Sequence, residues 1–288
     1  MTAPSPSRPS EVKEWCISGG FHPSRTLGQN FLTDGNAIDF IVDASGAAPG
    51  RNILEVGPGL GAITRPMLER GASVTAVEKD ERLATLLRRE LSAHSEHFDL
   101  IVADALDLPL DEFLGRRFDA FVSNLPYSVG TRILLDICRH PLAPPLLLVM
   151  VQREVADRLV AGPGDDERGL AGVWVQARWD VKPLRTVTAN CFWPRPEVSS
   201  TVVQLTLHDR LPAEAAKRFY RLTKVAFTQR RKQLATILKN NAAVLGLAAG
   251  SAAAQQPLAA ASVDPAARPE SLSHEDWLRL ALALPATP

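Results

Sequence analysis

Short apolar runs alternate with amphipathic stretches along the first part of the chain, and this alternation limits the possible folds more than any other feature. Five runs rich in β-branched or apolar residues predict strands, at 52–56, 73–78, 99–103, 120–123 and 146–152. Stretches with helical spacing lie between them, for example at 81–93 and 131–140. Strands that alternate with helices are typical of a parallel sheet with crossover helices. We therefore predict an α/β fold of Rossmann-like type.

The pattern changes after residue 178. Residues 181–188 and 199–207 predict two further strands, which we expect to add an antiparallel edge to the sheet. From residue 213 onward strand signals disappear and helices are expected, at 213–227, at 231–240 and from Ser273 onward. Ser273 can cap this last helix, with Asp276 in its first turn favoured by the helix dipole.

These changes divide the chain into three predicted parts. Residues 1–20 are Pro/Ser-rich at their start and are expected to form a disordered tail, 21–208 the α/β domain, and 209–288 a small helical domain. No apolar run approaches the ~20 residues that span a bilayer, and the N-terminus lacks the apolar stretch of a signal peptide. Cys16, Cys138 and Cys191 are far apart and show no metal-ligand spacing. We therefore predict a cytoplasmic protein without membrane segments or a bound metal.

Charge is balanced over the whole chain but not along it. Lys and Arg number 32, as do Asp and Glu, so the formal net charge is zero. Between Asp209 and Asn240, however, nine basic residues stand against only Asp209 and Glu214. The nine are Arg210, Lys217, Arg218, Arg221, Lys224, Arg230, Arg231, Lys232 and Lys239. Such a cluster is either a solvated helix face or a surface that neutralises phosphates.

A glycine-rich segment, Gly57-Pro58-Gly59-Leu60-Gly61, follows the first expected strand. Its Gly-x-Gly-x-Gly spacing after Glu55 differs from the Gly-x-Gly-x-x-Gly of dinucleotide-binding proteins. Glu78 ends the second strand, 21 positions after Gly57, where an acid can hold ribose hydroxyls, and Asp104 ends the third, where it can meet an adenine amino group. These residues predict a site for an adenosine-containing ligand. A tight turn without a ligand is the alternative for the loop alone.

The fourth strand ends in Asn124-Leu125-Pro126-Tyr127. N6 of adenine is a poor nucleophile because its lone pair is delocalised into the ring. The Asn124 oxygen and a nearby carbonyl, for which we choose that of Leu125, can accept the amino hydrogens and localise this lone pair. Pro126 stiffens the turn, and Tyr127 offers a flat face on which a base can stack. The alternative is an ordinary turn with a packed tyrosine.

A second aromatic residue, Phe192, opens Phe192-Trp193-Pro194-Arg195-Pro196. It could clamp the other face of the base, and core packing is the alternative. No catalytic His or Tyr/Lys pair is evident after the fourth strand, which argues against a nicotinamide-dependent dehydrogenase.

Taken in order, these motifs resemble the KsgA-type ribosomal RNA adenine dimethyltransferase family. The resemblance runs from Arg25 to the final helix and includes Leu27-Gly28-Gln29-Asn30-Phe31-Leu32. It continues through the segments 57–61, 124–127, 151–159, 192–203 and 226–232. The resemblance implies a class I S-adenosylmethionine methyltransferase sheet with a small C-terminal helical domain. It also implies donor contacts, at Asn30, Leu32, Gly57, Glu78, Asp104 and Asn124.

The resemblance further implies a substrate and partners. The substrate would be two adjacent adenosines in the 3′-terminal hairpin of 16S ribosomal RNA, within an immature small subunit, and the helical domain would help to dock this RNA. Nothing in the sequence demands more than a monomer. Two related functions stay open: an Erm-type methyltransferase of 23S ribosomal RNA, and a non-catalytic assembly factor. The segments 192–203 and 229–232 favour the KsgA type over the former, and intact Glu78, Asp104, Asn124 and Tyr127 argue against the latter.

Overall fold

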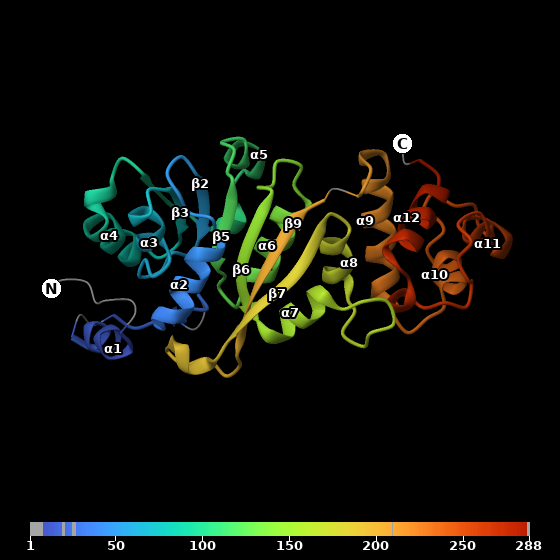
Figure 1. Ribbon diagram of the computed structural model, residues 1–288. Coiled ribbons are helices and arrows are strands. Elements are labelled where there is room, and N and C mark those ends of the chain that lie inside the picture. Colours follow the sequence, from blue (N-terminus) through green and yellow to red (C-terminus); the bar gives the residue numbers. More distant parts are fainter. Residues whose placement is uncertain (1–7, 19–20, 25–26, 209, 287–288) are drawn as a thin grey trace. The chain divides into compact units, whose positions relative to one another are not determined.

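The computed structural model describes residues 8–18, 21–24, 27–208 and 210–286 (Figure 1). The chain divides into two compact units. The first comprises residues 1–156 and 182–206, and the second 157–181 and 207–288. The predicted boundary at 208/209 is therefore incomplete, because a segment from the middle of the chain joins the C-terminal helices.

A seven-stranded sheet forms the centre of the fold, in the order β4-β3-β2-β5-β6-β9-β7. The strands are β2 (Asn52–Val56), β3 (Ser73–Glu78), β4 (Phe98–Val102), β5 (Ala120–Asn124), β6 (Leu146–Gln152), β7 (Trp179–Val187) and β9 (Ser200–Leu207). β2 to β6 pair in parallel, and β9 pairs antiparallel to β6. The predicted Rossmann-like α/β fold with an antiparallel addition is confirmed.

Helices cover both faces of this sheet. They are α2 (Gly35–Ala44), α3 (Thr64–Glu69), α4 (Glu81–Glu90), α5 (Leu110–Leu114) and α6 (Gly130–Arg139), with 3-10 turns η1 (Ser92–His94), η2 (Ala105–Asp107) and η3 (Ala189–Cys191). Ile53 shares a core cluster with α2, α3 and α4, whereas its neighbour Leu54 faces α5 and α6. Successive strand residues point to opposite faces, so a nearly continuous apolar strand such as β2 is buried on both.

The N-terminal segment differs from the prediction. Residues 9–18, expected within a disordered tail, form helix α1 (Pro9–Ser18), while 1–7 and 19–20 lie outside the described residues. Val12 and Cys16, one turn apart on the same helix face, are fully buried. They pack with apolar side chains that include Phe21 and Phe31. This burial explains why the segment is ordered.

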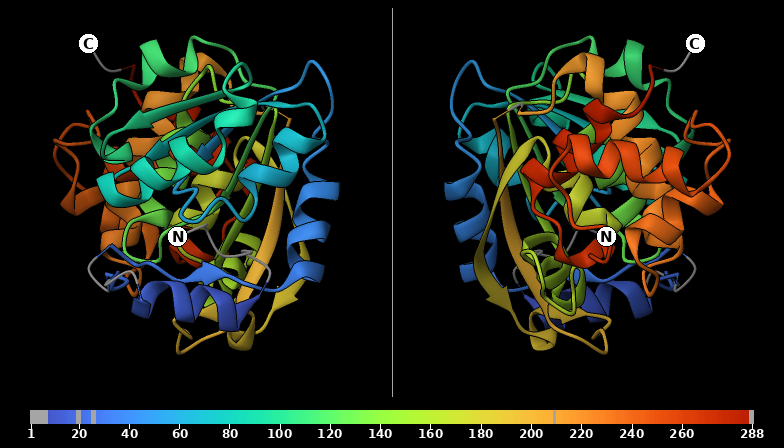
Figure 2. Two further views of the ribbon diagram at one scale, coloured as in Figure 1. Left: turned by 90° about the vertical axis from the view of Figure 1, so that its left-hand side faces the viewer. Right: turned by 90° about the vertical axis from the view of Figure 1, so that its right-hand side faces the viewer.

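A two-stranded antiparallel ribbon follows helix α1. It joins β1 (Phe31–Leu32) to β8 (Phe192–Trp193), and α1 lies beside β8 (Figure 2). The ribbon brings the opening motif of the chain to the segment that begins at Phe192.

The second unit is helical. Helix α7 (Arg153–Val160) enters it, and α8 (Leu170–Gln176), α9 (Ala213–Thr228), α10 (Leu234–Asn240), α11 (Ser251–Ala260), η4 (Pro269–Ser271) and α12 (His274–Ala283) complete it. Phe219, Leu238 and Trp277 are fully buried in its core. The buried Arg168 guanidinium donates to the carbonyls of Ala161 (2.9 Å) and Leu272 (3.0 Å), which binds the inserted segment to the C-terminal helices.

None of the helices in the described part of the chain is both long and apolar enough to cross a membrane.

Candidate active site

One cavity lies at the carboxyl ends of the parallel strands and is built entirely from the first unit. Among its lining residues are nine of the ten predicted site residues: Asn30, Leu32, Gly57, Glu78, Asp104, Asn124, Leu125, Pro126 and Tyr127. The register explains this convergence. Glu78 pairs with Val102, the last residue of β4, and Asn124 pairs with Met150 near the end of β6, so the strands end close to one another. Residues that follow parallel strands therefore meet at one edge of the sheet.

The glycine-rich loop packs closely against its neighbours, with its glycines in conformations that other residues rarely adopt. Gly57 and Gly59 have φ values of 70° and 59°, in the region that favours glycine. A Cβ atom on Gly59 would stand 3.2 Å from the Phe31 ring. The Gly57 N–H donates to the Val77 carbonyl (2.8 Å), which ties the start of the loop to the end of β3.

Glu78 is held by the loop and by the turn after β3. Only 6% of its surface is exposed, and its carboxylate accepts from the N–H groups of Gly59 (3.2 Å) and Asp80 (2.9 Å). Burial raises the pKa of Glu78, and these backbone donors oppose the rise. The carboxylate is thus oriented by the backbone at the wall of the cavity.

Asp104 has a more open setting. It accepts from Lys79 Nζ (2.5 Å) and from the Leu106 N–H (3.0 Å), so it caps the short turn η2. The hydrogen bond from Lys79 holds the pKa of Asp104 below its usual value. Asp104 is therefore ionised at neutral pH.

Glu55 lies beneath the loop and is 2% exposed. The Thr64 hydroxyl donates to Glu55 Oε2 (2.7 Å). Burial raises the pKa of Glu55 to about 8, and the nearby charge of Glu78 adds to the rise. At neutral pH this carboxyl is mainly protonated.

Asn124 uses its two amide atoms differently. Its Nδ2 donates to the Asn30 carbonyl (3.2 Å), whereas its Oδ1 is buried and has no hydrogen-bond partner among the described residues. Backbone hydrogen bonds fix the residues that follow. The Leu125 N–H donates to the Met150 carbonyl (3.2 Å), and the Gly130 N–H donates to the Pro126 carbonyl (2.7 Å). A carbonyl can only accept, so the Asn30 contact determines which way the amide of Asn124 is turned.

Two aromatic residues were predicted at the site, and the structure separates them. Tyr127 lines the cavity, and its hydroxyl shares a hydrogen bond of 2.6 Å with Ser200 Oγ. Phe192 is absent from the described lining of this cavity and is 3% exposed among core side chains such as Ile38 and Val202. Its pairing with Leu32 in the ribbon places it there. Core packing, the alternative that the sequence left open, is what the structure shows.

Comparison with known proteins assigns the chain to a family. The family model for ribosomal RNA adenine dimethylase matches residues 20–284. The chain belongs to this family.

Curated relatives of this dimethylase match almost its full length. A protein of Streptomyces avermitilis named ribosomal RNA small subunit methyltransferase A is 37% identical, over 98% of this chain and 96% of its own. A protein of Phenylobacterium zucineum with the same name is 39% identical, over 94% and 91%.

Solved structures agree on the fold. A dimethyladenosine transferase from Plasmodium falciparum superimposes with a TM-score of 0.73 at 22% identity, covering 85% of this chain and 94% of its own. The 23S rRNA methyltransferase ErmE gives a TM-score of 0.63 at 27% identity, covering 88% and 98%.

S-adenosylmethionine is the co-substrate of this class of enzyme, and the cavity fits it on structural grounds. The glycine loop leaves room for backbone approach, the Glu78 and Asp104 carboxylates stand at successive strand ends, and Asn124 Oδ1 is a buried acceptor without a partner among the described residues. Glu78 makes no ion pair in that same part of the chain, which suits a ligand with a positive charge. The described residues contain no cluster of three or more His, Cys, Asp or Glu that could hold a metal.

Sequence reasoning overlooked several residues of the site. Gln29, Lys79 and Ser128 line the cavity, and Ser200 partners Tyr127. Gln29 lies within the segment that carries the family resemblance, and Lys79 adjoins Glu78, so position along the chain could have indicated both. Ser200 also lies within a segment that carries the resemblance, 192–203, but only the pairing of β9 with β6 shows that it reaches this edge of the sheet.

Proposed function

We propose that this enzyme transfers methyl groups from S-adenosylmethionine to the N6 amines of two adjacent adenosines in the 3′-terminal hairpin of 16S ribosomal RNA. The main observation in support of this chemistry concerns Asn124, which lines the cavity. Its Oδ1 atom is buried and has no hydrogen-bond partner among the described residues. The choice of the small subunit rests on the relatives named for it, which are more similar to this chain than ErmE is.

Glu78, Asp104, Gly57, Asn30 and Leu32 are proposed to hold the donor. Glu78, fixed by two backbone N–H groups, accepts from ribose hydroxyls, and Asp104 accepts from the adenine amino group of the donor. When bound, S-adenosylmethionine would supply a methyl group on a sulfonium sulfur, which leaves as a neutral thioether, and the methylated amine would release one N6 proton to water. The remaining requirement is the position and the electron density of the attacking amine.

Asn124 and Leu125 are proposed to prepare that amine. In the first transfer Asn124 Oδ1 accepts one N6 hydrogen and the Leu125 carbonyl accepts the other, which localises the lone pair toward the donor. In the second transfer the monomethylated amine has one hydrogen left, which one of these acceptors holds. Because Asn124 Nδ2 donates to the Asn30 carbonyl, the oxygen is already oriented before the substrate arrives. Such preorganised acceptors cost no reorientation during the reaction. Pro126 holds the turn, and its carbonyl accepts from Gly130.

Tyr127 is proposed to stack on the extruded adenine. Its hydroxyl is tied to Ser200 Oγ, which fixes the ring, and burial raises its pKa, so the phenol stays neutral. Stacking of a base on an aromatic side chain is worth about 1–3 kcal/mol.

The second unit is proposed to contact the RNA through its basic side chains. Arg231 and Lys232, in the turn after α9, are exposed, and so is Lys239 at the end of α10. Exposed cations that neutralise phosphates add affinity without base specificity. We further propose that the enzyme acts as a monomer, in the cytoplasm, on an immature small subunit.

The test is incubation of the protein with radiolabelled S-adenosylmethionine and under-methylated small ribosomal subunits, followed by nucleoside analysis. We expect N6,N6-dimethyladenosine in the small-subunit RNA and none in large subunits treated in parallel. Label confined to the large subunit would point to an Erm-type activity instead. Donor binding without label in either subunit would indicate an assembly factor.

A further inference from the structure

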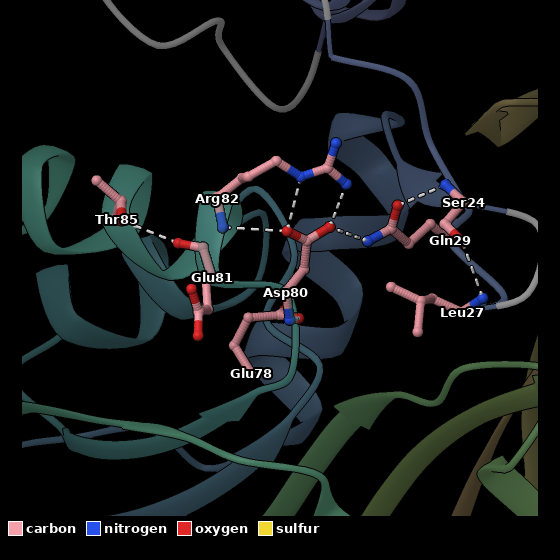
Figure 3. Close-up of polar contacts among 8 residues, drawn as sticks. All are labelled: Ser24, Leu27, Gln29, Glu78, Asp80, Glu81, Arg82 and Thr85. Carbon is pink, nitrogen blue, oxygen red and sulfur yellow. Dashed lines mark hydrogen bonds and ion pairs between the residues drawn. The ribbon is translucent and has the colours of Figure 1, made fainter.

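The side chain of Gln29 is held at both ends. Its Oε1 accepts from the Ser24 N–H (2.7 Å), and its Nε2 donates to Asp80 Oδ2 (3.0 Å). Figure 3 shows Gln29 between these two partners. Two further bonds close the same loop, from the Gln29 N–H to the Ser24 carbonyl (3.1 Å) and from the Leu27 N–H to Ser24 Oγ (3.3 Å). The Gln29 amide therefore links the backbone at Ser24 to the Asp80 carboxylate.

Asp80 connects Gln29 to Glu78, which is proposed to hold the methyl donor. It is 7% exposed, and its own N–H donates to Glu78 Oε1 (2.9 Å). Arg82 donates to it through Nε (3.0 Å) and a terminal nitrogen (2.7 Å), and this guanidinium holds the pKa of Asp80 at about 2 (Figure 3). Asp80 is therefore ionised, and its bond from Gln29 is charge-assisted.

The N-terminal segment makes a second contact with the turn after β3, through Phe21 and Arg82. The Arg82 guanidinium lies 4.6 Å from the centroid of the Phe21 ring, within the range of a cation–π contact. Phe21 in turn packs with Phe31, which lines the cavity. The positions of residues 21–24 and 27–32 thus depend on the turn that follows Glu78.

The same segment meets the acceptor motif on its other side. Gly28 has a φ of 65°, and a Cβ there would stand 3.0 Å from the Tyr127 nitrogen and 3.1 Å from the Ser128 nitrogen. Two residues on, the Asn30 carbonyl accepts from Asn124 Nδ2. A displacement of the segment would therefore reach both the backbone of Tyr127 and the amide of Asn124.

We infer that Gln29 and Asp80 are positioning residues for methyl transfer. Their hydrogen bond holds the segment 27–30 against the turn that bears Glu78, and so keeps the Asn30 carbonyl where it fixes the amide of Asn124. The inference rests on the proposed function and adds to it two residues that contribute through Asn30 and Asn124.

Gln29→Glu tests this bond with almost no change in shape. The new carboxylate still accepts from the Ser24 N–H, but it has no hydrogen to donate and brings a second negative oxygen against Asp80. We expect kcat per donor-binding site to fall about 10- to 100-fold, while the Kd for S-adenosylmethionine changes less than about threefold. Amide hydrogen exchange over residues 27–32 should become faster.

Restoring the bond with its charges exchanged is the decisive variant. When Gln29→Glu is combined with Asp80→Asn, the amide nitrogen introduced at position 80 can donate to the carboxylate introduced at position 29. The amide oxygen at position 80 can still accept from Arg82 Nε, whereas the bond from the terminal nitrogen of Arg82 is lost, because that nitrogen donates to the same oxygen as Gln29. Asn also serves as well as Asp at the N-cap position that Asp80 occupies in α4. We expect the double variant to be about tenfold more active than Gln29→Glu, a coupling that independent sites do not show.

A matched control tests whether a change in the net charge of the protein is enough to cause the effect. Gln256→Glu, at an exposed position of α11, adds the same negative charge in the second unit and should change neither kcat nor amide exchange over residues 27–32.

The outcomes separate the two ideas. A merely structural role would lower the melting temperature and the fraction of donor-binding protein, and leave kcat per site unchanged. That result, or a double variant no more active than Gln29→Glu, would overturn the inference. If the wild type itself transfers no methyl group, the proposed function fails. Amide exchange then still decides, because unchanged exchange at 27–32 in Gln29→Glu would overturn the positioning role by itself.

Discussion

Asn124 combines a donor and an acceptor in one side chain, and its surroundings use them for different ends. The Asn30 carbonyl takes the donor, and Oδ1 is left buried without a partner among the described residues. An unpaired buried acceptor costs about 1–3 kcal/mol. A substrate amine that donates to it removes this cost, so the folded site is complementary to an N–H donor at that position.

Replacing Asn124 separates acceptor chemistry from donor binding. We expect Asn124→Ala to lower methyl transfer at least about 100-fold, because the oriented oxygen is lost, with less than about a tenfold change in the Kd for S-adenosylmethionine. Asn124→Asp keeps an oxygen but cannot donate to Asn30, so it should also be impaired. Single-turnover transfer and calorimetric titration measure the two effects. Near-normal turnover in Asn124→Ala would remove Asn124 from the mechanism.

Glu55 should make stability depend on pH. Its pKa is about 8 in the folded protein, above the ordinary value of 4.5, so the folded state binds the proton more tightly. The associated stability is fully present below about pH 4.5 and is lost as the pH rises through about 8. Glu55→Gln keeps an oxygen for the Thr64 hydroxyl and cannot ionise. Between about pH 6 and pH 9 the melting temperature should therefore fall less in Glu55→Gln than in the wild type. Parallel curves would contradict the assignment.

At the scale of elements, the parallel strands were predictable and the ribbon was not. The predicted bounds of β2, β3 and β6 match the structure, because strands buried on both faces leave continuous apolar runs between turns. β1 and β8 have two residues each, too short for any periodicity, and only their pairing defines them. Helix α1 was missed because its buried face consists of few residues, chiefly Val12 and Cys16.

The site divides in the same way. Glu78 and Asn124 end their strands and Asp104 follows one, so topology alone predicts that they converge. Asn30 and Leu32 were expected only through the family resemblance, since their place depends on a long-range fit against Asn124 and β8. Phe192 shows the limit of this reasoning, because an aromatic residue beside a proline-rich turn can face the core or a ligand with equal ease.

Helix α12 offers a test of a predicted local feature. Ser273 Oγ accepts from the Asp276 N–H (3.1 Å), and the Asp276 carboxylate accepts from the Ser273 N–H (2.9 Å), which is a capping box at the predicted N-cap. Ser273→Ala should lower the free energy of unfolding by about 1 kcal/mol. Ser251→Ala is the matched control, because Ser251 starts α11 without a side-chain cap. Denaturant melts compare the two, and equal effects would show that the box contributes nothing.

At the scale of the whole molecule, a net charge of zero conceals an uneven distribution of basic and acidic residues along the chain. The chain is neutral overall, yet residues 209–240 carry nine basic residues against two acidic ones. Not all of these cations are free for RNA. Arg218 donates to the Leu284 carbonyl (2.9 Å), and Arg230 donates to the Asp166 carbonyl (2.5 Å) and pairs with Glu270 (3.7 Å), so both help to hold the second unit together. Asp209 lies outside the described residues. The structure thus divides the cluster into structural cations and exposed ones.

Reversing only the exposed charges tests the RNA-binding role without disturbing these bonds. Arg231→Glu with Lys232→Glu should weaken binding to small-subunit RNA and reduce the dependence of log Kd on log salt concentration by about 1–2. Methyl transfer to a saturating concentration of RNA should be nearly unchanged, because the cavity belongs to the first unit. Lys13→Glu with Arg88→Glu, two exposed positions of the first unit, makes the same charge change as a control and should leave the slope close to that of the wild type. If both double variants flatten the slope equally, RNA responds to total charge alone. If neither does, residues 231–232 form a solvated face, and docking must depend on other side chains.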